Sequence, residues 1–230
     1  MAAKPLPPPP APRLYLATPQ IDDPAPLAAA LPALLAAQDV AALLLRLTPS
    51  DPRSLITRAK AIAPAVQKAG VALLLDGEPE LVARSGADGA HLHGIAALKE
   101  FADKLQPDRI AGVGGLRTRH DAMLAGEIGA DYVLFGEPER EGQRPASDAI
   151  AERLQWWVEL FEPPCVGYAL SFEEAEEFAA AGADFVLVGD LIWNDARGPA
   201  AALADAAAAI ARGYQAVLAA HAAAGGAAPR

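Results

Sequence analysis

The 230-residue sequence is poor in sulfur-containing and aromatic residues, with one Cys, two Met and 6% aromatic residues. The single cysteine, Cys165, rules out a disulfide within the chain. It lies in an apolar stretch with no adjacent cation to activate it, so we predict a buried core residue. No charged segment followed by an apolar one opens the chain, as a secretory signal would require. We therefore expect a cytoplasmic protein.

Positive charge is also scarce. Nineteen Lys and Arg residues stand against 29 Asp and Glu residues, which gives a formal net charge of −10 at pH 7. Nucleic acids and anionic membrane surfaces bind basic protein faces. We therefore expect neither a nucleic acid nor a membrane as a partner.

A nine-residue pattern occurs three times, at 86–94, 129–137 and 182–190, and each copy begins Gly-Ala-Asp. The glycine suits the left-handed conformation that ends a helix, and the apolar run that leads to a second glycine has the length of a strand. Strands that are apolar on both faces are typical of a parallel sheet covered by helices. A helix-to-strand joint repeated along one chain indicates a closed barrel.

Eight segments have the composition of strands, and segments of helical composition separate them. The predicted strands are Leu14–Thr18, Ala41–Leu47, Val71–Asp76, Gly89–Leu92, Ile110–Val113, Tyr132–Phe135, Cys165–Tyr168 and Phe185–Val188. The predicted helices include Leu27–Ala37, Leu55–Lys68, Asp148–Phe161, Phe172–Ala181 and Ala200–Ala211. A (β/α)₈ barrel takes about 250 residues. We therefore predict one α/β domain over residues 13–221, a (β/α)₈ TIM barrel.

The two ends of the chain differ from this barrel in composition. Residues 1–12 contain four consecutive prolines and are predicted to form a disordered arm, and residues 222–230, rich in Ala and Gly, are predicted to fray.

Within the barrel, the adjacent Trp156 and Trp157 cannot share one face of a helix. We expect one of them at a subunit contact, in a homo-oligomer.

Two charged residues lie at predicted strand ends, where barrel enzymes assemble their active sites. Arg46 belongs to the end of the second strand and Asp76 to the end of the third. A guanidinium there suits bidentate binding of a phosphate or carboxylate, but it equally suits a structural ion pair with Asp76. Asp76 suits a general base or a ligand of Mg²⁺, which usually takes one or two carboxylates plus substrate phosphates.

The fourth predicted strand carries His91 and His93, which point to the same side because they are two residues apart. If that side faces the barrel interior, the two imidazoles can meet acidic residues in a pocket for a divalent metal ion. These acidic residues are Asp76, Glu78, Glu137 and Asp190. The alternative is that His91 only fixes the end of its strand.

Gly114 and Gly115 follow the fifth predicted strand. Their backbone N–H groups suit a phosphate, and a tight turn accounts for the two glycines equally well.

Four segments resemble, in order and spacing, the thiamine-phosphate synthase and thiazole tautomerase superfamily. They are Leu14–Thr18, Gly86–Leu92, Ile110–Val113 and Gly129–Gly136, and the resemblance extends over roughly Leu14 to Arg212. It implies a (β/α)₈ barrel and a phosphorylated small-molecule substrate. It also implies transfer of a pyrimidine methyl group from its diphosphate to thiazole phosphate, with release of pyrophosphate and the help of Mg²⁺.

Only part of the superfamily's site is present. The family's Gln-x-Arg-x-Lys run, which holds the diphosphate, corresponds to Leu44, Arg46 and Thr48, so the resemblance assigns the diphosphate to Arg46. The family's first metal ligand corresponds to Asp76, and Ala96 stands where the second carboxylate would be. The resemblance thus implies Arg46 and Asp76 as catalytic residues and Asp76 as the Mg²⁺ ligand.

The loops that bind phosphate in the family are changed as well. Its Pro-Thr-x-Thr-Lys loop corresponds to 137–141, which reads Glu-Pro-Glu-Arg-Glu. Where paired glycines and a Ser bind the thiazole phosphate, this chain has Gly167-Tyr168 and Gly189-Asp190. We predict phosphate binding by the strand-end glycines Gly114, Gly115, Gly136, Gly167 and Gly189. Two alternatives to the synthase remain: a non-catalytic binding or regulatory barrel, and a metal-assisted small-molecule enzyme with a changed substrate.

Overall fold

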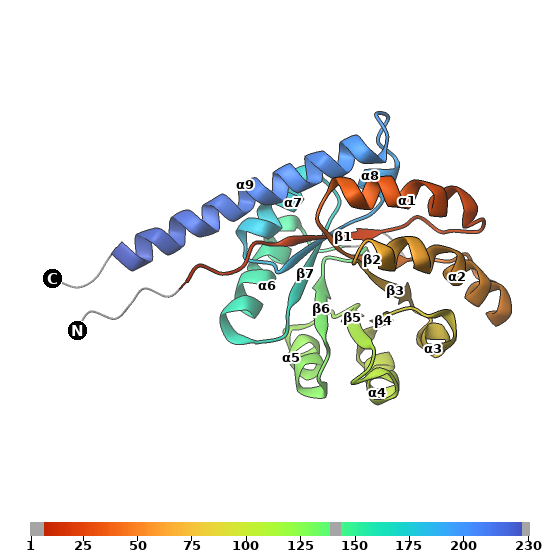
Figure 1. Cartoon of the computed structure of the whole chain (residues 1–230). Helices are drawn as coiled ribbons and strands as arrows, with labels where there is room; N and C mark the ends of the chain where they lie inside the picture. Colours follow the sequence, from red (N-terminus) through yellow and green to blue (C-terminus); the bar gives the residue numbers. More distant parts are fainter. Residues whose placement is uncertain (1–6, 139–143, 227–230) are drawn as a thin grey trace.

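The computed structural model describes residues 7–138 and 144–226, and these form a closed barrel of parallel strands in the order β1 to β8 (Figure 1). The predicted (β/α)₈ fold is confirmed. The strands are β1 (Arg13–Ala17), β2 (Val40–Leu45), β3 (Ala72–Asp76), β4 (Gly89–His93), β5 (Ile110–Gly114), β6 (Tyr132–Phe135), β7 (Cys165–Ala169) and β8 (Phe185–Val188).

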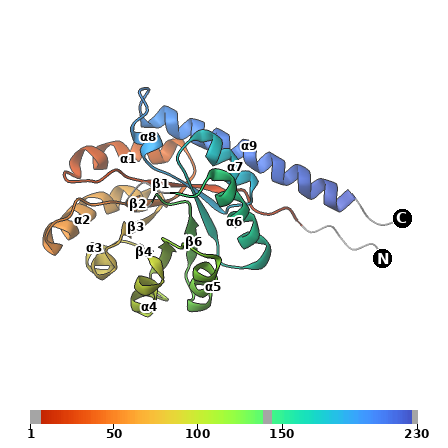
Figure 2. The same cartoon turned by 180° about the vertical axis from the view of Figure 1, so that it is seen from behind.

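Helices follow the strands and cover the outside of the barrel (Figures 1 and 2). They are α1 (Ala25–Ala37), α2 (Pro52–Lys68), η1 (Pro79–Leu81), α3 (Val82–Ser85), α4 (Gly94–Leu105), α5 (Arg119–Ile128), α6 (Ser147–Leu160), α7 (Phe172–Ala180), α8 (Asp190–Trp193) and α9 (Pro199–Gly226). The main apolar core lies between these helices and the outer faces of the strands.

The threefold Gly-Ala-Asp pattern is a structural device of the barrel. Its glycine takes the left-handed conformation in every copy, with φ of 79°, 96° and 91° at Gly86, Gly129 and Gly182. The alanine that follows is buried, and the aspartate accepts a backbone N–H from the preceding strand. These bonds are Leu73 N to Asp88 Oδ2 at 2.8 Å, Ala111 N to Asp131 Oδ2 at 2.7 Å and Cys165 N to Asp184 Oδ2 at 2.8 Å. Each copy therefore ends a helix and fixes the start of a neighbouring strand.

A second, smaller apolar cluster fills the barrel interior and contains Tyr15 and Tyr132. The two hydroxyls are 3.0 Å apart, although the tyrosines come from β1 and β6. Gly112 on β5 makes room for this arrangement, because a Cβ there would overlap the Tyr132 ring.

Helix α9 is longer than predicted: it runs to Gly226 and passes both Ala211 and the expected end of the fold at residue 221. It projects beside the N-terminal segment (Figures 1 and 2), where Tyr214 Oη donates a hydrogen bond to the Pro9 carbonyl at 2.6 Å. Residues 1–6 and 227–230 of the two predicted disordered ends lie outside the described residues. Among the helices that are described, none combines the length and the apolar character needed to cross a membrane.

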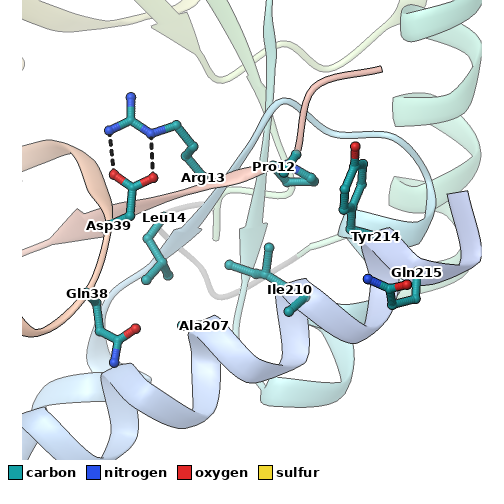
Figure 3. A pocket seen from close by; sticks show the side chains of 11 residues that line it. Pro12, Arg13, Leu14, Gln38, Asp39, Ala207, Ile210, Tyr214 and Gln215 are labelled. Atoms are coloured by element: carbon teal, nitrogen blue, oxygen red, sulfur yellow. Dashed lines mark hydrogen bonds and ion pairs between the residues drawn. The ribbon is translucent and has the colours of Figure 1, made fainter. Parts of the chain in front are cut away.

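A small cavity of 210 Å³ lies between α9 and the start of β1 (Figure 3). Pro12, Leu14 and Ile210 line it, and the ion pair of Arg13 with Asp39 stands at its edge. The cavity is at the amino ends of the strands. It therefore lies at the opposite end of the barrel from the carboxyl ends of the strands, which form the mouth described below.

The two tryptophans of α6 differ in burial, although their rings are in contact with each other and both pack against Phe161. Trp157 is fully buried and donates from Nε1 to the Pro163 carbonyl at 2.7 Å. Trp156 is partly buried against Phe161, and the guanidinium of Arg119 lies over its ring. The subunit contact stays a prediction.

Candidate active site

The carboxyl ends of the strands bring the predicted charged residues together at one mouth of the barrel. Asp76 ends β3, His93 ends β4 and Glu137 follows β6. His93 stands between the two carboxylates: its Nε2 is 2.8 Å from Asp76 Oδ1, and its Nδ1 is 3.9 Å from Glu137 Oε1. Asp76 and Glu137 therefore belong to one site.

Arg46 forms the ion pair with Asp76 that was one of its two expected roles. Arg46 Nε lies 3.2 Å from Asp76 Oδ2, and Arg46 Nη1 donates to Tyr168 Oη at 3.4 Å. Burial alone would raise the pKa of Asp76, but the hydrogen bond from His93 and the positive charges around it outweigh this and lower the pKa. The carboxylate is thus held ionised at the mouth.

His91 connects this mouth to the barrel interior. Its imidazole is fully buried, with Nδ1 2.8 Å from Tyr132 Oη and Nε2 3.2 Å from Glu137 Oε1. Tyr132 in turn pairs with Tyr15. Burial raises the pKa of both tyrosines, so both hydroxyls stay neutral. The result is a hydrogen-bonded chain from the interior to Glu137.

Glu137 occupies the glycine loop that we predicted for a phosphate. Its Oε2 accepts the backbone N–H of Gly115 at 3.0 Å, and a Cβ on Gly114 would overlap that same oxygen. Burial would raise the pKa of Glu137, but the charge and the hydrogen bond of His91 outweigh it and lower the pKa. Gly114 and Gly115 therefore hold a carboxylate of the chain itself.

Four members of the predicted metal-binding set meet at this mouth: Asp76, His91, His93 and Glu137. One ligand atom from each of His91, His93 and Glu137 lies within 4.8 Å of the other two. The two imidazoles are nearly perpendicular, with centroids 5.2 Å apart, and the hydrogen bond to Asp76 raises the pKa of His93.

The other two acidic residues of the predicted set are placed differently. Asp190 is the exposed first residue of the short helix α8. Glu78 directly precedes η1, and burial raises its pKa. The hydrogen bonds and ion pairs found among residues 7–138 and 144–226 link neither of them to the other four residues.

The remaining predicted glycines differ in position. Gly189 lies at the mouth, where a side chain would approach Tyr168 Oη and the Arg46 guanidinium. Gly167 faces the opposite way, because a Cβ there would come within 2.9 Å of Phe178 on α7. Its small size serves the packing of β7 against the helix layer.

Gly136 is hydrogen-bonded to Arg144, a contact that the sequence analysis did not predict. Its carbonyl accepts from Arg144 Nε at 2.7 Å, and Arg144 also binds Glu174 at 2.8 Å and the Tyr168 carbonyl at 2.6 Å. Arg144 follows the segment 139–143, which is outside the described residues and contains the rest of the changed family loop. No spacing rule pairs Arg144 with Glu174, so the sequence analysis did not predict this contact beside the mouth.

The chain is similar to proteins of one family. The family model described as thiamine monophosphate synthase matches residues 14–192. A thiamine-phosphate synthase from Rhodospirillum centenum is 42% identical over 196 residues, covering 84% of this chain and 95% of the relative. A second, from Hyphomonas neptunium, is 39% identical over 207 residues, covering 85% and 92%.

Solved structures agree at the level of the fold. A thiamine phosphate pyrophosphorylase from Pyrococcus furiosus superposes with a TM-score of 0.71 at 19% identity, covering 88% of this chain and 96% of that one. A 3-hexulose-6-phosphate synthase from Salmonella typhimurium gives 0.65 at 17% identity, covering 87% and 100%. Taken with the family match and the two close relatives, this places the chain in the thiamine monophosphate synthase family.

Proposed function

We propose that the protein is a thiamine-phosphate synthase, which transfers a pyrimidine methyl group from its diphosphate to thiazole phosphate. The observation that carries this proposal is the 42% identity to a relative of that name over 95% of the relative's length. The strand-end positions of Arg46 and Asp76, the charged residues that the resemblance assigns to the reaction, support it. We further propose a cytoplasmic location.

Arg46 is the group that we assign to the departing diphosphate. Its Nε is bonded to Asp76 and one Nη1 hydrogen to Tyr168, so a guanidinium with five N–H donors keeps donors for phosphate oxygens. Its side chain is 17% exposed at the mouth, where charge interactions are less screened than on an open surface. A fixed cation there stabilises the negative charge that develops as the pyrophosphate leaves.

The expected Mg²⁺ does not fit the residues that are present. Mg²⁺ prefers an octahedral shell of oxygen ligands. Both oxygens of Asp76 are already engaged, Oδ1 by His93 and Oδ2 by Arg46. At the position of the family's second carboxylate stands Ala96, and the donors next to Asp76 are imidazoles. We therefore assign no step of the reaction to Mg²⁺.

The proposal is tested by giving purified protein both substrates and measuring thiamine phosphate, in parallel reactions with Mg²⁺, Mn²⁺ and Zn²⁺. We expect product with at least one of the three ions and strongly reduced product with Arg46→Ala. Arg13→Ala is the matched control, because Arg13 also pairs with an aspartate but at the opposite end of the barrel. No product above background under any of the three conditions would overturn the proposal.

A further inference from the structure

We infer that His91, His93 and Glu137 form a three-ligand site for a divalent transition metal ion of the Zn²⁺ type. The inference concerns the same mouth as the proposed reaction but does not rest on that reaction, because metal binding is measured on the protein alone. Three features support it: the way Glu137 is held, the way the two imidazoles are held, and the space between them.

Glu137 is held by one oxygen, and its other oxygen faces the two imidazoles. Gly115 N–H fixes Oε2 at 3.0 Å, and Oε1 then points to His91 Nε2 at 3.2 Å and to His93 Nδ1 at 3.9 Å. An ion bound at 2.0–2.2 Å from nitrogen and oxygen ligands needs ligand atoms roughly 3 to 4 Å apart. Both distances from Oε1 lie in that range.

Each imidazole is held by its far nitrogen, so that its near nitrogen faces Glu137, the third ligand. His93 Nε2 is 2.8 Å from Asp76 Oδ1, so Nδ1 is the atom on the side of Glu137. His91 Nδ1 is 2.8 Å from Tyr132 Oη, so Nε2 is the atom on that side. Metal-binding histidines almost always have their other nitrogen bonded to a carboxylate or another polar group, which sets the tautomer and the ring orientation. Asp76 is then a positioning residue that acts through His93.

The backbone leaves room for this cluster. A Cβ on Gly114 would overlap Glu137 Oε2 and would lie 2.7 Å from His91 Nε2. Two carboxylates and one guanidinium surround the imidazoles, so Asp76, Glu137 and Arg46 together contribute a net charge of −1 that attracts a cation.

The ligand types select the class of metal. Imidazole suits Zn²⁺, Cu²⁺, Fe²⁺ and Ni²⁺, whereas Mg²⁺ and Ca²⁺ prefer sites made of oxygen alone. Three protein ligands leave a coordination position open, as in catalytic zinc sites. His93 is 52% exposed, so solvent reaches this cluster.

The test is calorimetry of the full-length chain after removal of metal with EDTA, titrated with ZnCl₂ and, separately, with MgCl₂. We expect one Zn²⁺ per chain and at least tenfold weaker binding of Mg²⁺. His93→Gln and Glu137→Gln each remove a ligand and should weaken Zn²⁺ binding by more than tenfold. Asp76→Asn should weaken it by about 10- to 100-fold, the range for partners that orient a ligand. His120→Gln is the matched control, because His120 is an exposed histidine on α5.

Melting curves of each variant without metal show whether it is folded, and only folded variants enter the comparison. The inference is overturned if wild-type protein binds no Zn²⁺ at micromolar concentration. It is also overturned if His93→Gln and Glu137→Gln bind as the wild type does, or if Mg²⁺ binds as tightly as Zn²⁺. The assay for thiamine phosphate is independent of the calorimetry. If the protein binds Zn²⁺ but forms no product, the proposed function is overturned and the inferred metal site is not.

Discussion

Arg46 and Asp76 form a mostly buried ion pair between the ends of neighbouring strands, with 3.2 Å between Arg46 Nε and Asp76 Oδ2 and side chains that are 17% and 16% exposed. The same carboxylate accepts from His93 through its other oxygen. Asp76 therefore fixes both the cation that we assign to the diphosphate and one of the imidazoles that we assign to the metal. A change at Asp76 affects both functions, whereas a change at Arg46 can separate them.

Arg46→Ala should reduce kcat/KM for thiamine phosphate formation by at least about 30-fold, which corresponds to about 2 kcal/mol of transition-state stabilisation. Arg46→Lys should recover only part of the loss, because a lysine cannot make the bidentate contact. Steady-state kinetics with both substrates measure the effect, with Arg13→Ala as the control. An Arg46→Ala enzyme with wild-type kcat/KM would show that another group binds the diphosphate.

Gly167→Ala should destabilise the fold without changing the mouth. The added Cβ meets Phe178 at 2.9 Å, and overpacking of this kind costs about 1 to 3 kcal/mol. Urea unfolding measures the loss, and the KM for thiazole phosphate should stay at the wild-type value at a temperature where the variant is folded. A raised KM with unchanged stability would instead support the phosphate-binding role predicted from the sequence.

The sequence predicted the fold well because the repeated Gly-Ala-Asp joints are local signals. Gly129 takes a positive φ, and Asp131 accepts a hydrogen bond from the neighbouring strand β5. In the sequence, both requirements appear as a Gly and an Asp two residues apart. The meeting of Arg46, Asp76 and His93 also followed from topology, because all three lie at carboxyl ends of parallel strands.

The partners within the site did not follow from the sequence. Gly115 offers the same backbone N–H to a phosphate or to a carboxylate, and only the fold shows that Glu137 takes it. Gly167 and Gly189 both follow or occupy apolar strands, yet one faces α7 and the other the mouth. Which side a glycine faces depends on barrel register, and a residue without a side chain carries no polarity to reveal it.

Cys165 should be unreactive toward Ellman's reagent in the native protein at pH 8. Burial, with the charge of Asp184 beside it, raises the pKa of the thiol to about 12, so only roughly one molecule in ten thousand carries the reactive thiolate. The thiol is also fully buried. One thiol per chain should react in denaturing urea. Stoichiometric reaction within minutes under native conditions would place Cys165 at an accessible position.

Tyr15, Tyr132 and His91 are linked by hydrogen bonds in this order. The order predicts that Tyr15→Phe and Tyr132→Phe differ in their effects on stability and on Zn²⁺ affinity. Tyr15→Phe removes one hydroxyl but leaves the 2.8 Å bond between Tyr132 Oη and His91 Nδ1, so it should cost about 1 kcal/mol of stability and leave Zn²⁺ affinity unchanged. Tyr132→Phe leaves both His91 Nδ1 and the Tyr15 hydroxyl buried without this partner. It should cost about 1 to 3 kcal/mol and weaken Zn²⁺ binding by about 10- to 100-fold, because His91 loses the bond that orients it. Urea midpoints at constant m-value give the stabilities, and calorimetry gives the affinities. Equal effects of the two substitutions on Zn²⁺ affinity would mean that Tyr132 does not orient His91.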